Sequence, residues 1–282
     1  MLEINRLSFP GLGIGPFEVN ETAFTVFGLD IAWYAIIIAC GMIFAVCYTI
    51  YRAKDIGITV DDILDYVIFV IPFGVLGARL YYVIMEIENY KTLWDVLNFR
   101  EGGLAIYGGI LVGTLTVFIV SKVKKISFRA LGDCIVPGLI MAQSIGRWGN
   151  FINAEAHGGV TDSFLRMGIE NVFGTFEYYH PTFLYESLWN LVGFIGVNLI
   201  FKKKQYDGQM ILVIFGWYGL GRMWIEGMRT DSLYLFGTSL RASQVLAAML
   251  FVGCLAALIW FAIKKPNAPL YKKPAKNEKE KA

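Results

Sequence analysis

The chain has 282 residues, of which 56% are hydrophobic and 17% are charged, and its formal net charge is +2. A soluble domain usually carries about a quarter of charged residues, so this composition argues against an ordinary soluble protein. The near-neutral charge gives no reason to expect a nucleic-acid partner.

Apolar blocks follow one another along the chain, and residues 31–50 and 242–263 contain no charged side chain at all. About twenty apolar residues in a helix cross a hydrocarbon core of about 30 Å, and backbone amides in lipid must be satisfied within the segment. The sequence therefore predicts an all-α fold, a polytopic transmembrane helical bundle. About seven spans fit best, near residues 31–50, 63–85, 103–121, 131–152, 182–201, 208–227 and 242–263.

Lysine and arginine are distributed unevenly between the connections. One set of connections is rich in them and the other holds only Arg6, Lys91, Arg100, Arg166, Arg229 and Arg241. Basic residues favour the cytoplasmic side, so we expect the N-terminus outside and the C-terminus in the cytoplasm. We predict one transmembrane domain over residues 1–263, and a disordered, lysine-rich cytoplasmic tail over 264–282. The longest external connection is expected at 153–181.

Three arginines, Arg79, Arg147 and Arg222, lie inside predicted spans. Ionisable groups at that depth are costly and usually face a cavity or a partner. In the expected topology all three sit in the outer half of the membrane. Other polar residues that start or end spans gather at the same depth, namely Tyr34, Tyr107, His180 and Glu186. The sequence therefore predicts a polar site that opens toward the outer leaflet.

Helical spacing supports this site in two of the spans. Tyr218, Arg222, Glu226 and Arg229 are four, four and three residues apart, which places them on one face of a helix. A second polar run contains Arg147, Asn150, Asn153 and Glu155.

A structural interpretation of the arginines stays open beside the functional one. Arg222 could pair with Glu226 at helical spacing, and Arg79 could extend to the outer interface. We favour the structural interpretation for Arg79 and the functional one for Arg147 and Arg222. We interpret the glycines of the second and third spans as helix-packing positions: Gly74, Gly77, Gly108, Gly109 and Gly113. The two histidines are too few and too dispersed to argue for a metal.

Several segments resemble the prolipoprotein diacylglyceryl transferase family. Residues 146–155, GRWGNFINAE, followed by Gly158, look like its signature, and residues 180–186, HPTFLYE, resemble its second block. Tyr218 through Arg229 resembles a third block, and Trp33-Tyr34 and residues 102–109 match earlier segments. The resemblance covers nearly the whole chain in order.

The resemblance implies a multi-pass enzyme of the bacterial plasma membrane. It implies transfer of a diacylglyceryl group from phosphatidylglycerol to the lipobox cysteine of a preprolipoprotein signal peptide, in the first step of lipoprotein maturation. A thioether forms and glycerol phosphate leaves; no cofactor or metal is expected. Arg147 and Arg222 would hold the lipid phosphate. The other residues expected in the catalytic or substrate-binding site are Tyr34, Tyr107, Asn150, Asn153, Glu155, Tyr218 and Glu226.

One position departs from the family pattern, because many members have a histidine where this chain has Tyr107. A phenol titrates near pH 10, so a tyrosine is a poor base at neutral pH unless nearby arginines favour the phenolate. The proton acceptor therefore stays open between Tyr107 and Glu155. A transporter or flippase for an anionic lipid, and a lipid-binding scaffold, remain alternatives from other classes.

Overall fold

A computed structural model describes residues 4–90, 92–98, 102–230, 234, 240–264 and 269–274, apart from the side chain of Leu93. The chain forms two compact units, one made of residues 1–48 with 133–270, the other of residues 49–132 with 271–282. The helices α1 and α5 each pass from one unit into the other.

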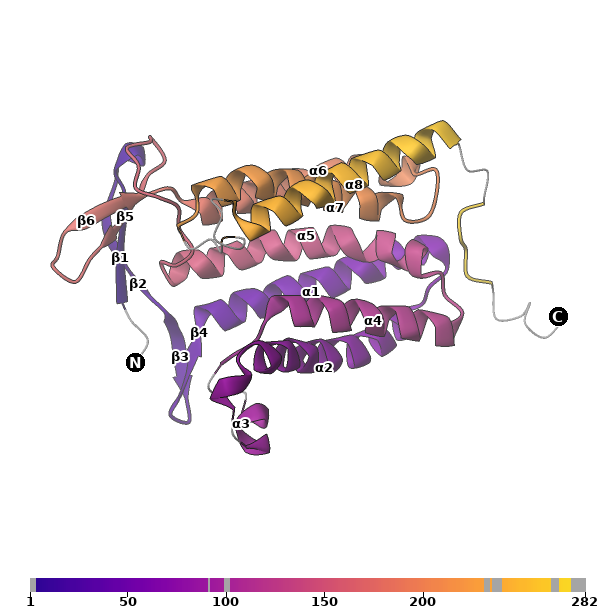
Figure 1. Ribbon diagram of the computed structural model, residues 1–282, viewed down its shortest axis with the longest axis horizontal. Coiled ribbons are helices and arrows are strands. Elements are labelled where there is room, and N and C mark those ends of the chain that lie inside the picture. Colours follow the sequence, from indigo (N-terminus) through magenta and orange to yellow (C-terminus); the bar gives the residue numbers. More distant parts are fainter. Residues whose placement is uncertain are drawn as a thin grey trace. The chain divides into compact units, whose positions relative to one another are not determined.

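A long helix occupies each of the seven segments predicted as spans (Figure 1). These helices are α1 (Trp33–Ala53), α2 (Val60–Met85), α4 (Ile106–Lys124), α5 (Phe128–Ile152), α6 (Thr182–Ile200), α7 (Gln209–Ile225) and α8 (Ala242–Lys264). In the described part of the chain, five are long and apolar enough to cross a membrane: α1, α2, α4, α6 and α8. The shorter helices are η1 (Pro10–Leu12), η2 (Lys54–Ile56), η3 (Ile87–Asn89), α3 (Leu93–Leu97), η5 (Phe201–Lys203) and η6 (Glu226–Met228).

The prediction of a helical fold is confirmed for most of the described chain, but the fold is not all-α, because two small antiparallel sheets are present as well. The first sheet has the order β2-β1-β5-β6, from β1 (Ile4–Phe9), β2 (Ile14–Asn20), β5 (Met167–Glu170) and β6 (Phe176–Tyr179). The second pairs β3 (Thr22–Val26) with β4 (Leu29–Ala32). These strands have four to seven residues, and such short runs carry a weaker sequence signal than twenty apolar residues do.

The first sheet joins the N-terminal segment to the long connection between α5 and α6. Leu7 of β1 pairs with Ile169 of β5, and the Leu7 side chain is fully buried. Asn5 also donates from Nδ2 to the carbonyl oxygen of Ile152, the last residue of α5, at 3.1 Å. The N-terminal segment and the connection after α5 therefore lie on the same side of the first unit.

In the second unit α2 packs closely against α4. A side chain on Gly77 would collide with Val112, and one on Gly108 would collide with the Gly77 carbonyl oxygen, so both positions serve helix packing as predicted. At the start of α2, Asp62 completes a capping box with Thr59 and pairs with Lys124 at 3.2 Å.

The C-terminal tail contributes to the second unit as well. Lys273 pairs with Asp62, and its backbone N–H donates to the carbonyl of Ile56 at 2.8 Å. The predicted disorder of 264–282 falls partly outside the described residues and stays a prediction.

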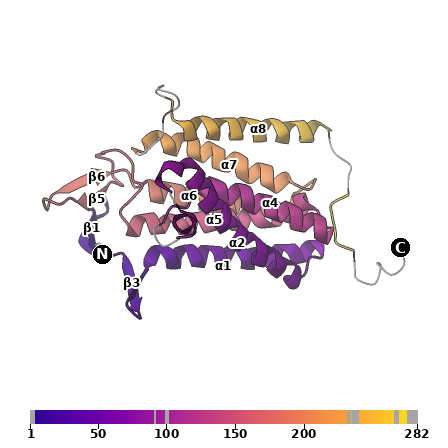
Figure 2. The same cartoon turned by 60° about the horizontal axis from the view of Figure 1, so that its bottom comes forward.

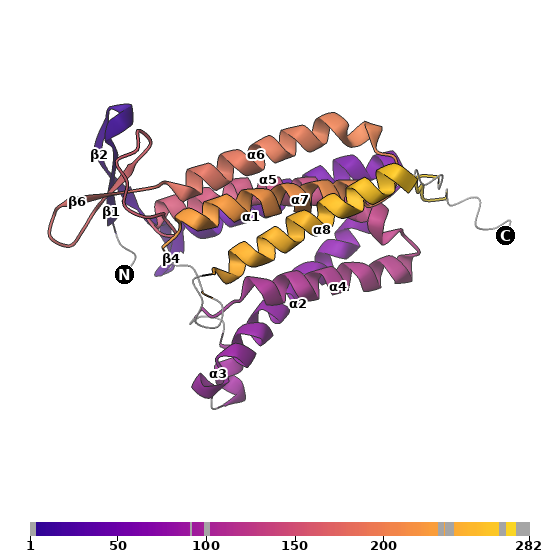
Figure 3. The ribbon, with the colours of Figure 1, turned by 45° about the horizontal axis from the view of Figure 1, so that its top comes forward.

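In the first unit α7 lies between α6 and α8 (Figure 3). The fully buried Asp133 of α5 fixes the start of α7, because its carboxylate accepts hydrogen bonds from the backbone N–H groups of Gly208, Met210 and Ile211. Lys204 neutralises the same carboxylate at 3.0 Å. A carboxylate at a helix N-terminus is favoured by the unpaired amides there and by the helix dipole.

Candidate active site

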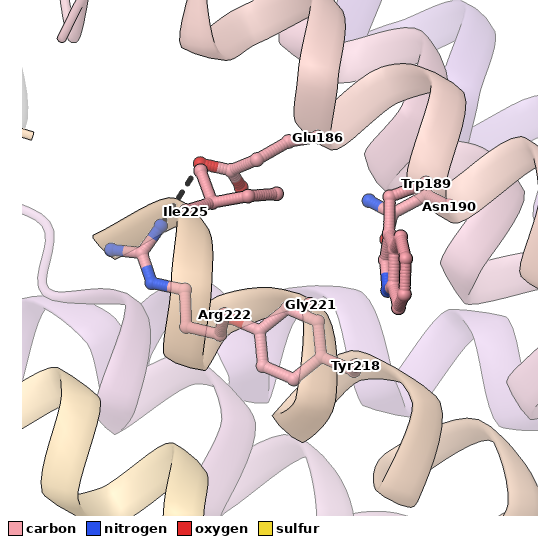
Figure 4. A pocket seen from close by; sticks show the side chains of 7 residues that line it. All are labelled: Glu186, Trp189, Asn190, Tyr218, Gly221, Arg222 and Ile225. Carbon is pink, nitrogen blue, oxygen red and sulfur yellow. Dashed lines mark hydrogen bonds and ion pairs between the residues drawn. The ribbon is translucent and has the colours of Figure 1, made fainter. Parts of the chain in front are cut away.

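Glu186 of α6 lies among three arginines from three other segments of the first unit. Glu186 as a whole is only 5% exposed. One carboxylate oxygen pairs with Arg147 of α5, and the other lies 3.0 Å from Arg222 of α7 and 3.6 Å from Arg229. Figure 4 shows the Arg222 guanidinium and the Glu186 carboxylate pointing toward each other. One buried carboxylate thus joins segments that are far apart in the sequence.

A second buried carboxylate, Glu226, completes this arginine–glutamate cluster (Arg147, Glu186, Arg222, Glu226 and Arg229). Glu226 is 2% exposed and lies 2.5 Å from Arg222, at the helical spacing that predicted this pair. Arg241 donates to the backbone carbonyl of Glu226. Among the described side chains of the cluster, three guanidinium groups gather around two carboxylates. Such a group of forked donors suits an oxyanion such as a phosphate.

A chain of polar side chains leads from the cluster to the surface. Arg147 donates to the amide oxygen of Asn150 at 3.2 Å, and Asn150 donates to Glu155 at 2.9 Å. Asn153 donates to the same Glu155 oxygen at 3.3 Å. Glu155 itself is exposed. The structure therefore brings together Arg147, Asn150, Asn153 and Glu155, as their spacing predicted. The Glu155 carboxylate lies at the solvent-exposed end of this chain of side chains.

The backbone on both sides of Glu155 is strained. Ala154 and Ala156 have φ angles of 48° and 54°, in the left-handed region that costs an ordinary residue about 1–2 kcal/mol. A hydrogen bond stabilises this backbone conformation, because the Thr182 hydroxyl donates to the Ala156 carbonyl at 2.6 Å. Strain of this kind is concentrated at functional sites, where it fixes the direction of a side chain. It here presents Glu155 beside the two asparagines.

Tyr34 and Tyr218 lie in the same unit as the cluster. Tyr34, at the start of α1, packs its ring against Gly149, where an added Cβ would lie 2.6 Å from Cδ2 of the ring. Tyr218 lines a small cavity beside Arg222 (Figure 4). The residues lining this cavity are Glu186, Trp189, Asn190, Tyr218, Gly221, Arg222 and Ile225.

Tyr107 and Arg79 belong to the second unit. Tyr107 is the second residue of α4, its side chain is half exposed, and its ring centroid lies 6.5 Å from that of Tyr81. Arg79 is buried and donates to five backbone carbonyls, two within α3 and three after it: Asp95, Val96, Asn98, Gly102 and Gly103. This arrangement supports the structural interpretation of Arg79, with backbone carbonyls as its partners in place of an interface.

A tryptophan pair holds α6 against α7 beside the cluster. The rings of Trp189 and Trp217 stack with centroids 4.2 Å apart and planes 12° apart. Each indole N–H donates to the backbone carbonyl of the other tryptophan, at 3.0 and 2.9 Å. Each ring also fills the space above a glycine four residues after its partner, Gly221 beneath Trp189 and Gly193 beneath Trp217.

Gly221→Ala and Gly193→Ala are therefore expected to destabilise the protein by about 1–3 kcal/mol, because the added methyl group collides with an indole ring. The measurement is the thermal unfolding midpoint in detergent. Gly196→Ala of the same helix α6 is the matched control, since its Cβ would meet nothing within 4 Å and alanine favours the helix. Equal midpoints for Gly221→Ala and Gly196→Ala would contradict the packing role.

The sequence placed Glu186 and Arg229 near the expected polar site but assigned neither a catalytic or binding role, and it assigned none to Arg241. The signal for Glu186 was present, because it is the single charged residue of the segment 182–200. Among the described residues, no three His, Cys, Asp or Glu side chains are grouped so that they could hold a metal ion.

Comparison with known proteins adds the chemical context. A family model described as prolipoprotein diacylglyceryl transferase matches residues 21–260. The phosphatidylglycerol–prolipoprotein diacylglyceryl transferase of Clostridioides difficile is 43% identical over 250 residues, which cover 88% of this chain and 98% of that protein. The proteins of the same name from Listeria welshimeri and Enterococcus faecalis are 41% and 39% identical, over 92% and 93% of this chain and 96% and 97% of theirs.

The chain belongs to the prolipoprotein diacylglyceryl transferase family. The match includes every residue of the arginine–glutamate cluster and the polar chain to Glu155. Strands β1 and β2 precede it.

Proposed function

We propose that this chain transfers the diacylglyceryl group of phosphatidylglycerol to the lipobox cysteine of a preprolipoprotein. Family membership supports this reaction. The structure supports it through the arginine–glutamate cluster, in which three guanidinium groups face two buried carboxylates. Its guanidinium groups are opposite in charge to an anionic headgroup, and their forked donors match phosphate oxygens.

In the proposed reaction the cysteine sulfur attacks the glycerol carbon that carries the phosphate ester. The new C–S bond is a thioether. The C–O bond to the phosphate breaks, and glycerol phosphate leaves with the electron pair. Negative charge grows on the leaving phosphate, so Arg147 and Arg222 stabilise the transition state more than the ground state. Glu186 and Glu226 orient the two guanidinium groups for this purpose.

The attacking species is the thiolate, and a free thiol titrates near pH 8.5, so a proton acceptor or a positive field must assist. Glu155 is one candidate acceptor, because two asparagine amides hold its carboxylate at the exposed end of the polar chain. Asn150 and Asn153 then have a positioning role. Tyr107 is the other candidate, and Tyr34 and Tyr218 shape the lipid site.

The decisive experiment supplies the purified protein with vesicles containing phosphatidylglycerol and a synthetic lipobox peptide. The expected products are the diacylglyceryl thioether, detected by mass spectrometry, and one glycerol phosphate for each thioether. Movement of labelled lipid between leaflets without any thioether would instead favour a flippase. A flippase also needs polar groups toward the cytoplasmic side of the membrane. The Asp133 carboxylate, the main polar feature expected there, already pairs with Lys204 and accepts hydrogen bonds from the start of α7.

The proposed setting is the bacterial plasma membrane, with seven spans, the site toward the outer leaflet and the tail in the cytoplasm. The pairing of β1 with β5 supports this topology, since it requires the N-terminal segment and the connection after α5 to share a side. A reporter active only in the cytoplasm is expected to be active when fused after Lys264. The same reporter fused between 160 and 175 is expected to be inactive, and its activity there would contradict the topology.

Tyr107 offers a test of the proton acceptor. If its hydroxyl positions the lipid headgroup, Tyr107→Phe should lower transfer roughly tenfold, and Tyr107→His should keep substantial activity because imidazole also donates a hydrogen bond. If Tyr107 is the base, Tyr107→His should move the pH optimum down, because imidazole titrates near pH 6.5 and phenol near pH 10. The measurement is the pH profile of transfer, and a fully active Tyr107→Phe would exclude both roles. We favour positioning.

A further inference from the structure

The hairpin formed by β3 and β4 has one apolar face and one polar face. Cross-strand pairs place Phe24 opposite Ile31 and Val26 opposite Leu29, and these four side chains share one face because strand residues alternate. The pair between them in the register, Thr25 and Asp30, lies on the other face, joined by a hydrogen bond of 2.7 Å.

Among the described residues of the first unit, most of the apolar face is left exposed. Phe24 is 52% exposed, Leu29 is 61% exposed, and Phe27 at the tip is completely exposed. Figures 1 and 2 show the tip of the hairpin pointing away from α1 and from the four-stranded sheet. An exposed group of large apolar side chains is usually a contact surface for a partner or for lipid.

The residue at the tip breaks the local rule for a tight turn. Phe27 and Gly28 both have positive φ angles, 50° and 78°, as in the two-residue turns that favour Asn-Gly. A phenylalanine in this conformation is strained, and inside the protein its ring gains nothing in return. A contact of the Phe27 ring with something outside the protein therefore explains a phenylalanine at this turn position better than turn formation does.

The position of the hairpin indicates what that contact is. β4 ends at Ala32 and runs directly into α1, which is long and apolar enough to span a membrane. Trp33 and Tyr34 at this junction are exposed aromatic residues, the type that gathers where the hydrocarbon core meets the headgroups. The Trp33 amide also donates to the Glu21 carbonyl at 2.9 Å, which ties the base of the hairpin to the helix start.

We propose that the β3–β4 hairpin is an interfacial anchor that lies on the bilayer surface where α1 begins and inserts Phe27 among the upper acyl chains. Its apolar face, Phe24, Val26, Leu29 and Ile31, rests on lipid, and its polar face, Thr25 and Asp30, stays in water. Amphipathic elements of this kind sink about 5–10 Å into the headgroup–acyl boundary.

The test places an environment-sensitive fluorophore at single cysteines of the full-length protein in phosphatidylcholine–phosphatidylglycerol vesicles. The exposed Cys40 and Cys47 are first replaced by alanine. A label at Leu29→Cys on the apolar face, with Phe27 retained, is expected to be blue-shifted, and to be quenched by lipids with a nitroxide near the headgroup roughly threefold more than a label at Thr25→Cys on the polar face. Equal quenching at the two positions would overturn the proposal.

A second variant separates insertion from folding of the hairpin. Phe27→Asn suits the turn and removes the aromatic ring, so the hairpin should keep its shape but lose its anchor. A label at Leu29→Cys should then lose about half of its quenching or more relative to the same label with Phe27 present. Unchanged quenching would contradict the role of Phe27. Shielding of these labels only after a lipobox peptide is added would show a polypeptide contact and refute the lipid anchor.

Discussion

Arg147→Ala and Arg222→Ala are each expected to lower diacylglyceryl transfer by about 100-fold or more, because each removes donors that the proposed mechanism assigns to the leaving phosphate. Arg147→Lys and Arg222→Lys should recover little of this loss. A lysine keeps the charge but cannot contact Glu186 and two phosphate oxygens at once with a planar fork. The measurement is thioether formation per mole of membrane-inserted protein.

The control for these variants is Arg6→Ala. Arg6 also pairs with a glutamate, Glu170 at 2.8 Å, but this pair is exposed on the four-stranded sheet and such pairs contribute about 0–1 kcal/mol. Arg6→Ala should therefore keep near-normal transfer. A double variant with lysine at 147 and 222 that transfers normally would refute bidentate phosphate binding. Loss of inserted protein with normal specific activity would assign both arginines a structural role.

The long helices could be predicted from the sequence because membrane spans need about twenty apolar residues. The segment 242–263 agrees with Ala242–Lys264 almost to the residue, and 63–85 differs from Val60–Met85 only by three residues at the capped start. The sheets were not predicted. Strands such as Met167–Glu170 are short, and their partners lie far away in the sequence, so neither length nor local periodicity reveals them.

The site could be predicted where its contacts are local. The pairing of Arg222 with Glu226 and the run from Arg147 to Glu155 follow from residues that are two to five positions apart. The role of Glu186 could not be predicted in this way. Its three arginine partners are 36 to 43 residues distant, and only the packing of α5, α6 and α7 brings them to one carboxylate.

Glu186→Gln is expected to lower kcat by about tenfold or more without raising the apparent KM for phosphatidylglycerol. The amide has the same shape as the carboxylate but loses the charge that holds Arg147, Arg222 and Arg229 in their present directions. The site gains net positive charge, so an anionic headgroup still binds. The guanidinium groups are less well oriented for the leaving phosphate, and this loss affects the transition state in particular.

The division between kcat and KM distinguishes this role from a purely structural one. Breaking a buried ion-pair network can cost about 3–5 kcal/mol of stability, so Glu186→Gln should also lower the thermal midpoint. If Glu186 only stabilised the bundle, the folded fraction would fall while kcat per folded molecule stayed normal, and that result would remove Glu186 from the catalytic site. Glu177→Gln, on an exposed strand residue of β6, controls for the loss of one negative charge and should leave both constants unchanged.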